Sequence, residues 1–389
     1  MKRVYFATRV RGFFRHLLNC QAFEWEFKTS DMNMIYETQG KKSKLISKVA
    51  RLKFFDWIGL IQVINCQVKK AEIYGSFNRF LKTDKPYFIY LENPTAVYHY
   101  RLGRNKSFLG KRKVNKLLSD ENLKAIICLS KACSDTFEDV CDINRKFKGI
   151  KKVIYPYIPE NTLTTKELIG NRCQKELKLL YVAQGDRFIS KGAPEIIDAF
   201  KKLKEKYESD ISLTIITSID VANQEVLKSA QNISGINVLD FKLDPKEMMA
   251  LYNEHSVLLH PTSDDSSALT ILEAMKAGLP IISTTLYAIP EMVKDGVNGY
   301  LTNPKWSFFD ENNIPNPRVW NNRKKTIHNT CCDKKTSLFL FDRIETLLND
   351  RNLLFKMSMN SLEISNSKPF DLESIANSWN EVLDEINVS

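Results

Sequence analysis

Residues 256–301 constrain the fold more than any other part of the chain, because they alternate sharply between apolar runs and breaking residues. SVLLHPT is a short apolar run of the kind that forms a buried parallel strand. ALTILEAMKA then has apolar residues at helical spacing, beginning near Ser267, and Gly278 and Pro280 end the helix. A second apolar run follows. This order predicts strand, loop, helix and strand in an open α/β sheet, which binds its ligands at the carboxyl ends of the strands.

The loop and helix of this segment carry two carboxylates, Asp265 and Glu273, eight residues apart. The free N–H groups at the start of a helix bind anions, and small side chains let a phosphate reach the backbone. Ser266, Ser267 and Ala268 are small, so we expect a diphosphate to lie against the backbone from Ser266 to Leu269. An acidic pair at a helix start is also common for capping alone.

The same segment resembles the donor-binding signature of retaining GT-B glycosyltransferases of family 4, also called group 1. That signature has two glutamates eight residues apart, followed by Ala-Met-x-x-Gly-x-Pro. Here Asp265 stands at the first glutamate, Glu273 at the second, and Ser266–Ala268 replaces a usual Gly-aromatic-Gly. The resemblance implies that Glu273 binds the ribose hydroxyls and that Asp265 faces the donor sugar, with one methylene less reach.

A second segment, LKLLYVAQGDRFISKGAPEIIDAFKKLKEKY, supports this interpretation. It predicts a strand, a polar loop that contains Gly185, and a helix from Pro194. The family usually carries an arginine and a lysine five residues apart in this loop, which implies a clamp on the diphosphate. Lys191 matches the lysine, whereas Asp186 occupies the arginine position and Arg187 follows it. We expect Lys191 and Arg187 to stabilise the leaving diphosphate, although any single lysine can also be a surface residue.

Strand and helix patterns alternate through most of the chain, which predicts an α/β protein with doubly wound parallel sheets. With the resemblance, the expected fold is GT-B, with two Rossmann-like domains facing a cleft. We expect residues 1–160 to bind the acceptor and 161–369 to bind the nucleotide sugar, with a polar insertion at 303–335 that is either functional or disordered. The segment 370–389 resembles the family's terminal helix, which packs back on the first domain. Helices are expected at 45–65, 131–143, 223–231 and 244–255.

The first domain offers weaker candidates. His99 follows a predicted strand, and a family histidine in a comparable region contacts the donor sugar; a packed or surface histidine is equally consistent with the sequence. Glu92 and Asn93 end the same strand. The first strand is followed by a loop with a single glycine and with Arg9, Arg11 and Arg15, which either bind a phosphate or form a solvated basic loop.

Charge is divided unevenly along the chain. Residues 1–160 hold 31 Lys and Arg against 15 Asp and Glu, whereas residues 161–389 hold 26 against 31. Residues 101–116 contain seven basic residues and no acid. A basic domain favours an anionic partner, and we expect a lipid phosphate at the cytoplasmic face of a membrane. Nucleic acid is the competing partner, but no RNA-binding aromatic signature or zinc-ligand set supports it.

Other features bound the location. No stretch reaches the roughly 18 apolar residues that cross a bilayer, and arginines interrupt any secretory signal near the start. The eight cysteines are scattered without a CxxC motif, which indicates reduced thiols and a cytoplasmic protein. We expect no metal and no cofactor besides the nucleotide-diphosphate sugar, UDP- or GDP-linked.

Taken with the resemblance, these features predict a retaining hexosyltransferase that uses a saccharide or lipid-linked saccharide acceptor in the synthesis of lipopolysaccharide, O-antigen or capsule. Two alternatives stay open beside nucleic-acid binding. One is a nucleotide-sugar 2-epimerase, which shares the fold and needs no acceptor. The other is a catalytically impaired scaffold of an assembly complex. Asp186 and Asp265 favour it, because both depart from the residues usual in the family.

Overall fold

The structure is a computed structural model that describes residues 2–29, 52–66, 71–208 and 210–388. The chain forms two compact units. The first unit consists of Met1–Ile158, Glu311–Pro315 and Pro369–Ser389, and the second consists of Pro159–Asp310 and Asn316–Lys368.

The first unit is built on a parallel sheet with the strand order β2-β1-β4-β6-β7-β8. Its central strands β4 and β6 are buried along their whole length, as expected where helices cover both faces of a sheet. The strands are β1 (Lys2–Phe6), β2 (Trp25–Thr29), β4 (Ile73–Phe77), β6 (Tyr87–Leu91), β7 (Leu123–Cys128) and β8 (Ile150–Val153), with β3 (Val63–Asn65) and β5 (Phe80–Lys82) forming a separate parallel pair.

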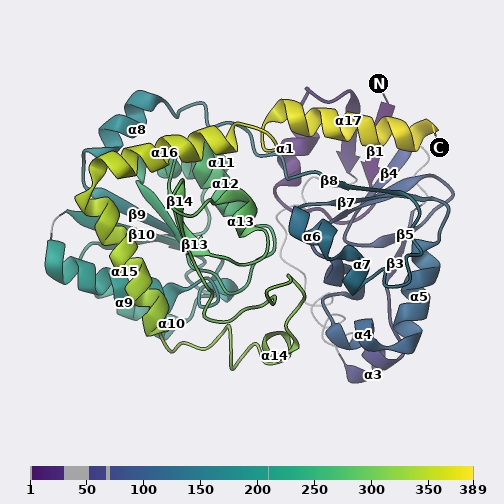
Figure 1. The fold of residues 1–389 in the computed structure, drawn as a ribbon, viewed down its shortest axis with the longest axis horizontal. Coiled ribbons are helices and arrows are strands. Elements are labelled where there is room, and N and C mark those ends of the chain that lie inside the picture. Colours follow the sequence, from purple (N-terminus) through teal and green to yellow (C-terminus); the bar gives the residue numbers. More distant parts are fainter. Residues whose placement is uncertain (1, 30–51, 67–70, 209, 389) are drawn as a thin grey trace. The chain divides into compact units, whose positions relative to one another are not determined.

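The helices of the first unit are short apart from α5 and α17. Helix α17 contributes Trp379, which is 1% exposed and whose ring contacts those of Phe27, Phe88 and Tyr90 on the strands. A segment far along the sequence therefore completes the core of the unit that contains the amino terminus (Figure 1). The helices are α1 (Phe14–Asn19), α3 (Lys53–Trp57), η2 (Pro94–Tyr98), α4 (Leu102–Lys106), α5 (Phe108–Leu118), α6 (Lys131–Asp135), α7 (Phe137–Val140) and α17 (Leu372–Val388).

Two helix predictions for this unit are wrong in part. Residues 45–51 lie outside the described residues, but 58–65 are not helical, because α3 ends at Trp57 and Val63–Asn65 pairs as strand β3 with β5. The helix expected over 131–143 is divided into α6 and α7 at Thr136. The Thr136 hydroxyl donates to the carbonyl of Ala132 at 2.7 Å, a contact that often bends helices.

The second unit has a parallel six-stranded sheet with the order β11-β10-β9-β12-β13-β14. The strands are β9 (Leu177–Val182), β10 (Ile211–Thr217), β11 (Ile236–Asp240), β12 (Val257–His260), β13 (Ile281–Thr284) and β14 (Gly299–Thr302). The helical elements are α8 (Lys166–Cys173), η3 (Gly185–Arg187), α9 (Ala193–Tyr207), α10 (Gln224–Gln231), α11 (Pro245–Glu254), α12 (Leu269–Lys276), α13 (Ile289–Met292), α14 (Pro317–Trp320), α15 (Lys334–Asn349) and α16 (Arg351–Ser365). Both sheets and their helices bear out the predicted α/β class.

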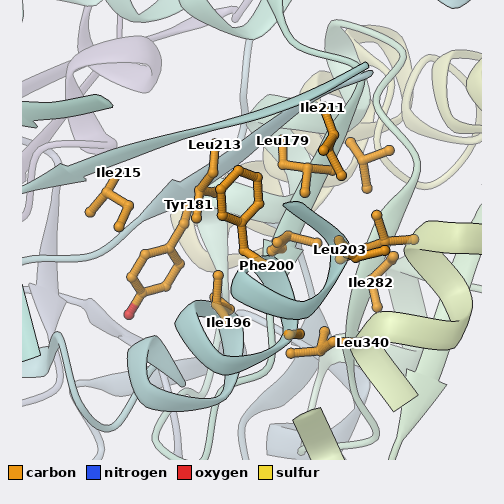
Figure 2. Packing of buried hydrophobic residues seen from close by; sticks show 14 of the residues in the cluster. Leu179, Tyr181, Ile196, Phe200, Leu203, Ile211, Leu213, Ile215, Ile282 and Leu340 are labelled. Atoms are coloured by element: carbon orange, nitrogen blue, oxygen red, sulfur yellow. The ribbon is translucent and has the colours of Figure 1, made fainter. Parts of the chain in front are cut away.

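Helix α9 packs one apolar stripe on the sheet of the second unit. Figure 2 shows Ile196, Phe200 and Leu203 of this helix against side chains from β9 and β10, with Leu340 of α15 at the edge of the cluster. These residues are almost completely buried, and each buried aliphatic or aromatic side chain stabilises the fold by about 1.5 to 3 kcal/mol. The packing fixes α9 on the sheet.

The segment 303–335, expected as a polar insertion, has an aromatic core. Phe308 stacks on Trp320 with ring centroids 4.1 Å apart, and Phe309 stacks on Tyr287 at the same separation. The Trp320 indole also donates to the carbonyl of Phe308 at 2.6 Å. Buried aromatic pairs of this kind stabilise the conformation of a loop. This segment is therefore an ordered part of the protein.

Candidate functional site

The candidate site lies where the strand order of the second sheet changes direction. Strands β10 and β11 follow β9 on one side, and β12, β13 and β14 follow on the other. Strands β9 and β12 are parallel neighbours, with Leu179 paired to Val257. The loops that leave two such strands diverge at the carboxyl edge and open a ligand crevice between them. Lys191 and Asp265 come from these two loops.

The first of these loops runs from β9 to α9 and depends on two glycines. A Cβ on Gly185 would lie 2.6 Å from the carbonyl oxygen of Ser218, so only glycine fits there. Gly192 has φ +93° and caps α9, and a Cβ there would lie 2.7 Å from the carbonyl oxygen of Pro261. This close approach brings Lys191 against the end of β12. The helix begins at Ala193, which puts Pro194 at its second position rather than its first.

Lys191, His260 and Asp265 form a buried charged cluster. The Lys191 ammonium forms an ion pair with Asp265 Oδ2, and His260 Nε2 lies 3.0 Å from the same oxygen. The side chains of Lys191 and Asp265 are 10% and 11% exposed. Burial alone would raise the pKa of Asp265, but the charge on Lys191 and the hydrogen bond from His260 hold it well below its usual range. The carboxylate is therefore ionised at neutral pH.

His260 is neutral in this cluster. Burial, with the adjacent charge of Lys191, lowers the pKa of its imidazole. Its contact with Asp265 places the proton on Nε2, since a carboxylate can only accept. The Nδ1 atom is buried and has no hydrogen-bond partner among the described residues. His260 thus orients the Asp265 carboxylate without adding a charge.

The second oxygen of Asp265 is also engaged. Asp265 Oδ1 accepts hydrogen bonds from the backbone N–H groups of Ser266 and Ala268, at 3.0 and 3.1 Å. Ala268 caps helix α12 with φ +39°, a left-handed conformation that costs about 1 to 2 kcal/mol for a residue with a Cβ. The helix itself begins at Leu269, two residues later than predicted. The N–H groups of Leu269 and Thr270 in its first turn have no intrahelical partner and form the anion-binding end of the helix.

Glu273 lies one turn further along α12 and is half-buried. Its Oε2 accepts a hydrogen bond from the hydroxyl of Tyr252 at 2.8 Å. Burial raises the pKa of Glu273, and the Tyr252 hydrogen bond opposes that shift. Tyr252 comes from α11, so this contact fixes the carboxylate from a neighbouring element. Glu273 keeps one oxygen for which no hydrogen bond is recorded within the described residues, which suits a vicinal diol.

The remaining predicted residues of this unit lie around the same loops. Ser266 and Ser267 are half-buried just before α12, Asp186 is exposed, and Arg187 is half-buried in η3. His328, from the segment 303–335, interacts electrostatically with Asp264, Asp186 and Arg187. The backbone N–H of Trp306 donates to the Ser263 hydroxyl at 3.2 Å. The segment 303–335 therefore contributes residues to the edge of the site.

His99 belongs to the first unit. Its Nε2 accepts a hydrogen bond from the backbone N–H of Gln62 at 3.0 Å. Burial, with the positive charges of Arg79 and Arg104, lowers the pKa of His99 to about 3. The side chain is therefore a neutral acceptor that holds the segment preceding β3. This geometry favours the packed histidine of the two sequence interpretations.

The carboxyl edge of the first sheet carries a polar cluster centred on Glu92. Arg11 forms an ion pair with it at 3.0 Å, so this arginine of the basic loop is paired rather than merely solvated. The Tyr100 hydroxyl donates to Glu92 at 3.1 Å, and the Glu92 N–H donates to the Asn78 side chain at 2.9 Å. Asn93 instead caps η2 by accepting from the N–H of Thr95. Arg9 lies in the same basic loop, and Arg15 lies in the first turn of α1.

Sequence reasoning missed several contributors to the site, among them His260, Tyr252, Trp306 and His328. His260 carried a usable signal, because a histidine ends an apolar strand directly before the donor loop. Tyr252 carried none, since it lies 21 residues before its partner. Trp306 lies in the segment 303–335, which was expected only as a polar insertion.

Across the described ranges, no helix is long and apolar enough to span a bilayer. Within those same ranges, no three His, Cys, Asp or Glu side chains gather in a way that could hold a metal ion.

Residues 176–310 match the model of the family described as "Glycosyl transferases group 1". A Klebsiella pneumoniae protein described as "Uncharacterized 41.2 kDa protein in cps region" is 27% identical over 195 residues, which cover 47% of this chain and 50% of that protein. "Lipopolysaccharide glucosyltransferase WaaG" of Escherichia coli (strain K12) is 26% identical over 122 residues, covering 31% of this chain and 32% of WaaG. The chain thus aligns with half or less of these curated relatives.

A solved structure extends the likeness to both units. Anabaena Alr3699/HepE in complex with UDP-glucose superposes with a TM-score of 0.60 at 14% identity, over 99% of this chain and 100% of that one. At this identity the likeness concerns the fold alone. The chain therefore has the GT-B fold of two Rossmann-like domains, and its residues 176–310 match the group 1 glycosyltransferases.

Proposed function

We propose that the protein is a glycosyltransferase that moves a hexosyl group from a nucleotide-diphosphate sugar to an acceptor hydroxyl, with retention of configuration, in the synthesis of surface polysaccharide. The observation that carries the proposal is the meeting of Lys191 and Asp265 at the switch point of the second sheet, beside the start of α12. The family match covers this segment. The relatives from a cps region and from lipopolysaccharide synthesis support the class of product.

The donor would occupy the crevice between the β9 and β12 loops. Its diphosphate would accept hydrogen bonds from the N–H groups of Leu269 and Thr270 and would meet the Lys191 ammonium. Gly185 lets the loop after β9 pass close to the backbone of Ser218. Arg187 lies on the same loop. Glu273 would accept from the ribose hydroxyls through the oxygen that Tyr252 leaves available. UDP is the first base to test, because the Anabaena neighbour binds UDP-glucose.

Donor binding would open the ion pair between Lys191 and Asp265. A diphosphate brings more charge to Lys191 than the carboxylate does, so the lysine would turn to it. Asp265 would then accept from hydroxyls of the donor sugar, with His260 still holding its orientation. Asp265 thus changes partner during the catalytic cycle. In the ligand-free protein its ion pair with Lys191 leaves the two side chains without net charge.

The transfer step balances without any further reactant. The bond between the anomeric carbon and the diphosphate oxygen breaks, and the acceptor oxygen bonds to that carbon on the same face. The acceptor's proton passes to the departing phosphate oxygen. Lys191 and the helix N–H groups stabilise the negative charge that develops on the leaving diphosphate, and such fixed charges usually lower a barrier by several kcal/mol. No metal or further cofactor is needed in this proposal.

The acceptor would be a saccharide or a lipid-linked saccharide. Residues 1–160 carry a large excess of basic residues, 31 against 15 acidic ones, which favours an anionic acceptor or an anionic membrane. We therefore propose a cytoplasmic protein that binds peripherally to the inner face of the cell membrane.

A second candidate function is that of a scaffold that binds partner proteins but no nucleotide. It is favoured by the saturation of Asp265, whose two oxygens are already occupied by protein donors. It is also favoured by Asp186, an acid at the family's arginine position.

Calorimetry with UDP, GDP, ADP and CMP, and with the corresponding sugars, tests the proposal. We expect one nucleoside diphosphate to bind the wild type and to bind Lys191→Met and Glu273→Gln at least about tenfold more weakly. Lys202→Met is the matched control, because Lys202 lies further along α9 and its ion pair is with Asp198 rather than with a residue of the candidate site. Release of an altered sugar without an acceptor would favour the epimerase, and no binding by any nucleotide would favour the scaffold.

A further inference from the structure

The first unit exposes a group of large apolar side chains on α3 and the start of α5. Phe54 is 61% exposed, Trp57 is 68% exposed and Phe108 is 77% exposed, with Leu52 and Leu109 beside them in sequence. The rings of Phe54 and Trp57 lie one helical turn apart, with centroids separated by 6.4 Å. Single exposed apolar residues are ordinary, but a contiguous patch usually marks an interaction site. We call these five residues the aromatic patch.

The two helices of the aromatic patch are joined by tight contacts. The Ser107 hydroxyl donates to the carbonyl of Trp57 at 2.6 Å, so Phe108 emerges directly beside the end of α3. Gly59 has φ +62°, and a Cβ there would lie 2.3 Å from the backbone nitrogen of Gly110. Two glycines therefore let the backbones meet. Figure 1 shows α3, α4 and α5 close to one another in this unit.

Helix α5 does not need its exposed apolar residues for its own packing. Gly110, Val114 and Leu118 are buried at helical spacing and face the unit. Phe108 lies outside that stripe. Because Phe108 is 77% exposed, its ring adds little to the packing of this unit and is accessible to a partner.

The aromatic patch lies among positive charges. Lys106, Lys111, Arg112, Lys113 and Lys116 are all exposed. Residues 101–119 contain no acid, and the nearby acid Asp56 is buried and paired with Arg101 and Arg104. Aromatic and aliphatic side chains beside unpaired basic ones are the composition that binds the surface of an anionic bilayer, where rings enter the headgroup region and cations meet phosphates.

We infer that the aromatic patch and the five exposed cations of 106–116 form the surface by which this protein docks on an anionic lipid bilayer, with Trp57 and Phe108 entering the interface. The inference rests on the proposed function in one respect, since that proposal already places the protein at a membrane. It goes further by assigning the surface and its occupant, and it holds whether or not the second unit is catalytic.

Vesicle flotation with the full chain tests the inference. The vesicles contain phosphatidylcholine alone or mixed with phosphatidylglycerol. We expect binding to the mixed vesicles only, with the ratio of bound to free protein lowered about tenfold by Trp57→Ser or Phe108→Ser. Lys111→Ala should lower it about fivefold, and high salt should remove most of the binding. Phe241→Ser is the matched control, because Phe241 is an exposed aromatic residue of the second unit, 40% exposed.

Fluorescence supplies a second measurement. Of the five tryptophans, Trp57 is the most exposed, whereas Trp25, Trp320 and Trp379 are buried and Trp306 is half-buried. Anionic vesicles should therefore shift the emission to the blue in the wild type and not in Trp57→Phe. Unchanged flotation of Trp57→Ser and Phe108→Ser, or equal binding to both kinds of vesicle, would overturn the inference. Self-association without lipid that these substitutions abolish would overturn it in favour of a second copy as the occupant.

Nucleotide binding separates this inference from the proposed function. Trp57→Ser and Phe108→Ser should bind the nucleoside diphosphate as the wild type does, because they lie outside the donor site. Flotation of a wild-type protein that binds no nucleotide would support the docking surface and contradict the transferase proposal. Nucleotide binding without flotation would support the transferase proposal and contradict the docking surface.

Discussion

Replacing Asp265 by asparagine separates the two roles that the proposed cycle gives to this residue. In the ligand-free protein the carboxylate holds Lys191 and accepts from His260, and in the donor complex it would turn to the sugar. Asparagine has almost the same shape but carries no charge. We expect Asp265→Asn to bind the nucleoside diphosphate more tightly than the wild type, but to lose the additional affinity that the sugar supplies.

The magnitude follows from the geometry of the pair. A phosphate that contacts Lys191 lies within about 5 to 6 Å of the Asp265 carboxylate, two hydrogen-bond lengths away. Two like charges at that distance repel by about 3 kcal/mol at an effective dielectric constant of 20. Solvent that enters the opened site screens about half of this repulsion, so removal of the charge should tighten nucleoside diphosphate binding about tenfold. The unliganded variant should lose about 2 to 3 kcal/mol of stability, because Lys191 is left buried without its counter-ion.

Calorimetry with the diphosphate and with its sugar conjugate gives both affinities, and hydrogen exchange of β9 and β12 gives the local stability. Asp264→Asn is the control, since it makes the same change of charge one residue away from the pair. The strands of the first unit serve as an internal reference for exchange. A folded Asp265→Asn protein that binds the diphosphate as weakly as the wild type, or more weakly, would refute the partner exchange.

Three further predictions follow from contacts described above. All five histidines have pKa values lowered by burial, so the unfolded chain binds more protons below about pH 6.5 and stability falls as pH falls. For His99 alone the free energy of unfolding falls by about 1.4 kcal/mol per pH unit between pH 6.5 and its folded pKa of about 3. His99→Asn should remove this contribution, so the thermal midpoint of the variant should fall less steeply with decreasing pH than that of the wild type. Ala268→Gly should stabilise the second unit by about 0.5 to 1 kcal/mol, because it relieves a left-handed φ, whereas the control Ala274→Gly inside α12 should destabilise it by about 1 kcal/mol or more in the same denaturation series. Gly299→Ala should lower the free energy of unfolding by about 3 kcal/mol or more, because its Cβ would lie 2.0 Å from a backbone oxygen of β13. A Cβ at Gly296 meets nothing within 4 Å, so Gly296→Ala should lower it by only about 1 kcal/mol, for the positive φ. Equal shifts of the thermal midpoint in the two variants would contradict this account.

Patterns whose partners are close in sequence were predictable. The capping box at Asp244 and Glu247 needs only four residues, and both of its hydrogen bonds are present. Gly278 ends α12 with a left-handed φ of +66°, as its place after a helical apolar run indicates. The alternation of strands and helices likewise predicted the α/β class, because each element carries its own period.

Features that depend on distant partners were not predictable. Val63–Asn65 reads as part of a helix until its pairing with β5 is known. The residue types of the site were identified from sequence, but the engagement of Asp265 by Lys191, 74 residues earlier, was not. The ring pairs of Phe308 and Trp320 turn a polar stretch into an ordered segment, and no periodic signal marks such a local cluster.

The place of helix α17 has a consequence for how the chain is made. Trp379 fills the core of the first unit, yet residues 159–368 are synthesised before it. On the ribosome the second unit can therefore acquire its complete core while the first still lacks the helix that covers Phe27, Phe88 and Tyr90. The amino-terminal half, with its basic surface and exposed rings, would be the later of the two to mature.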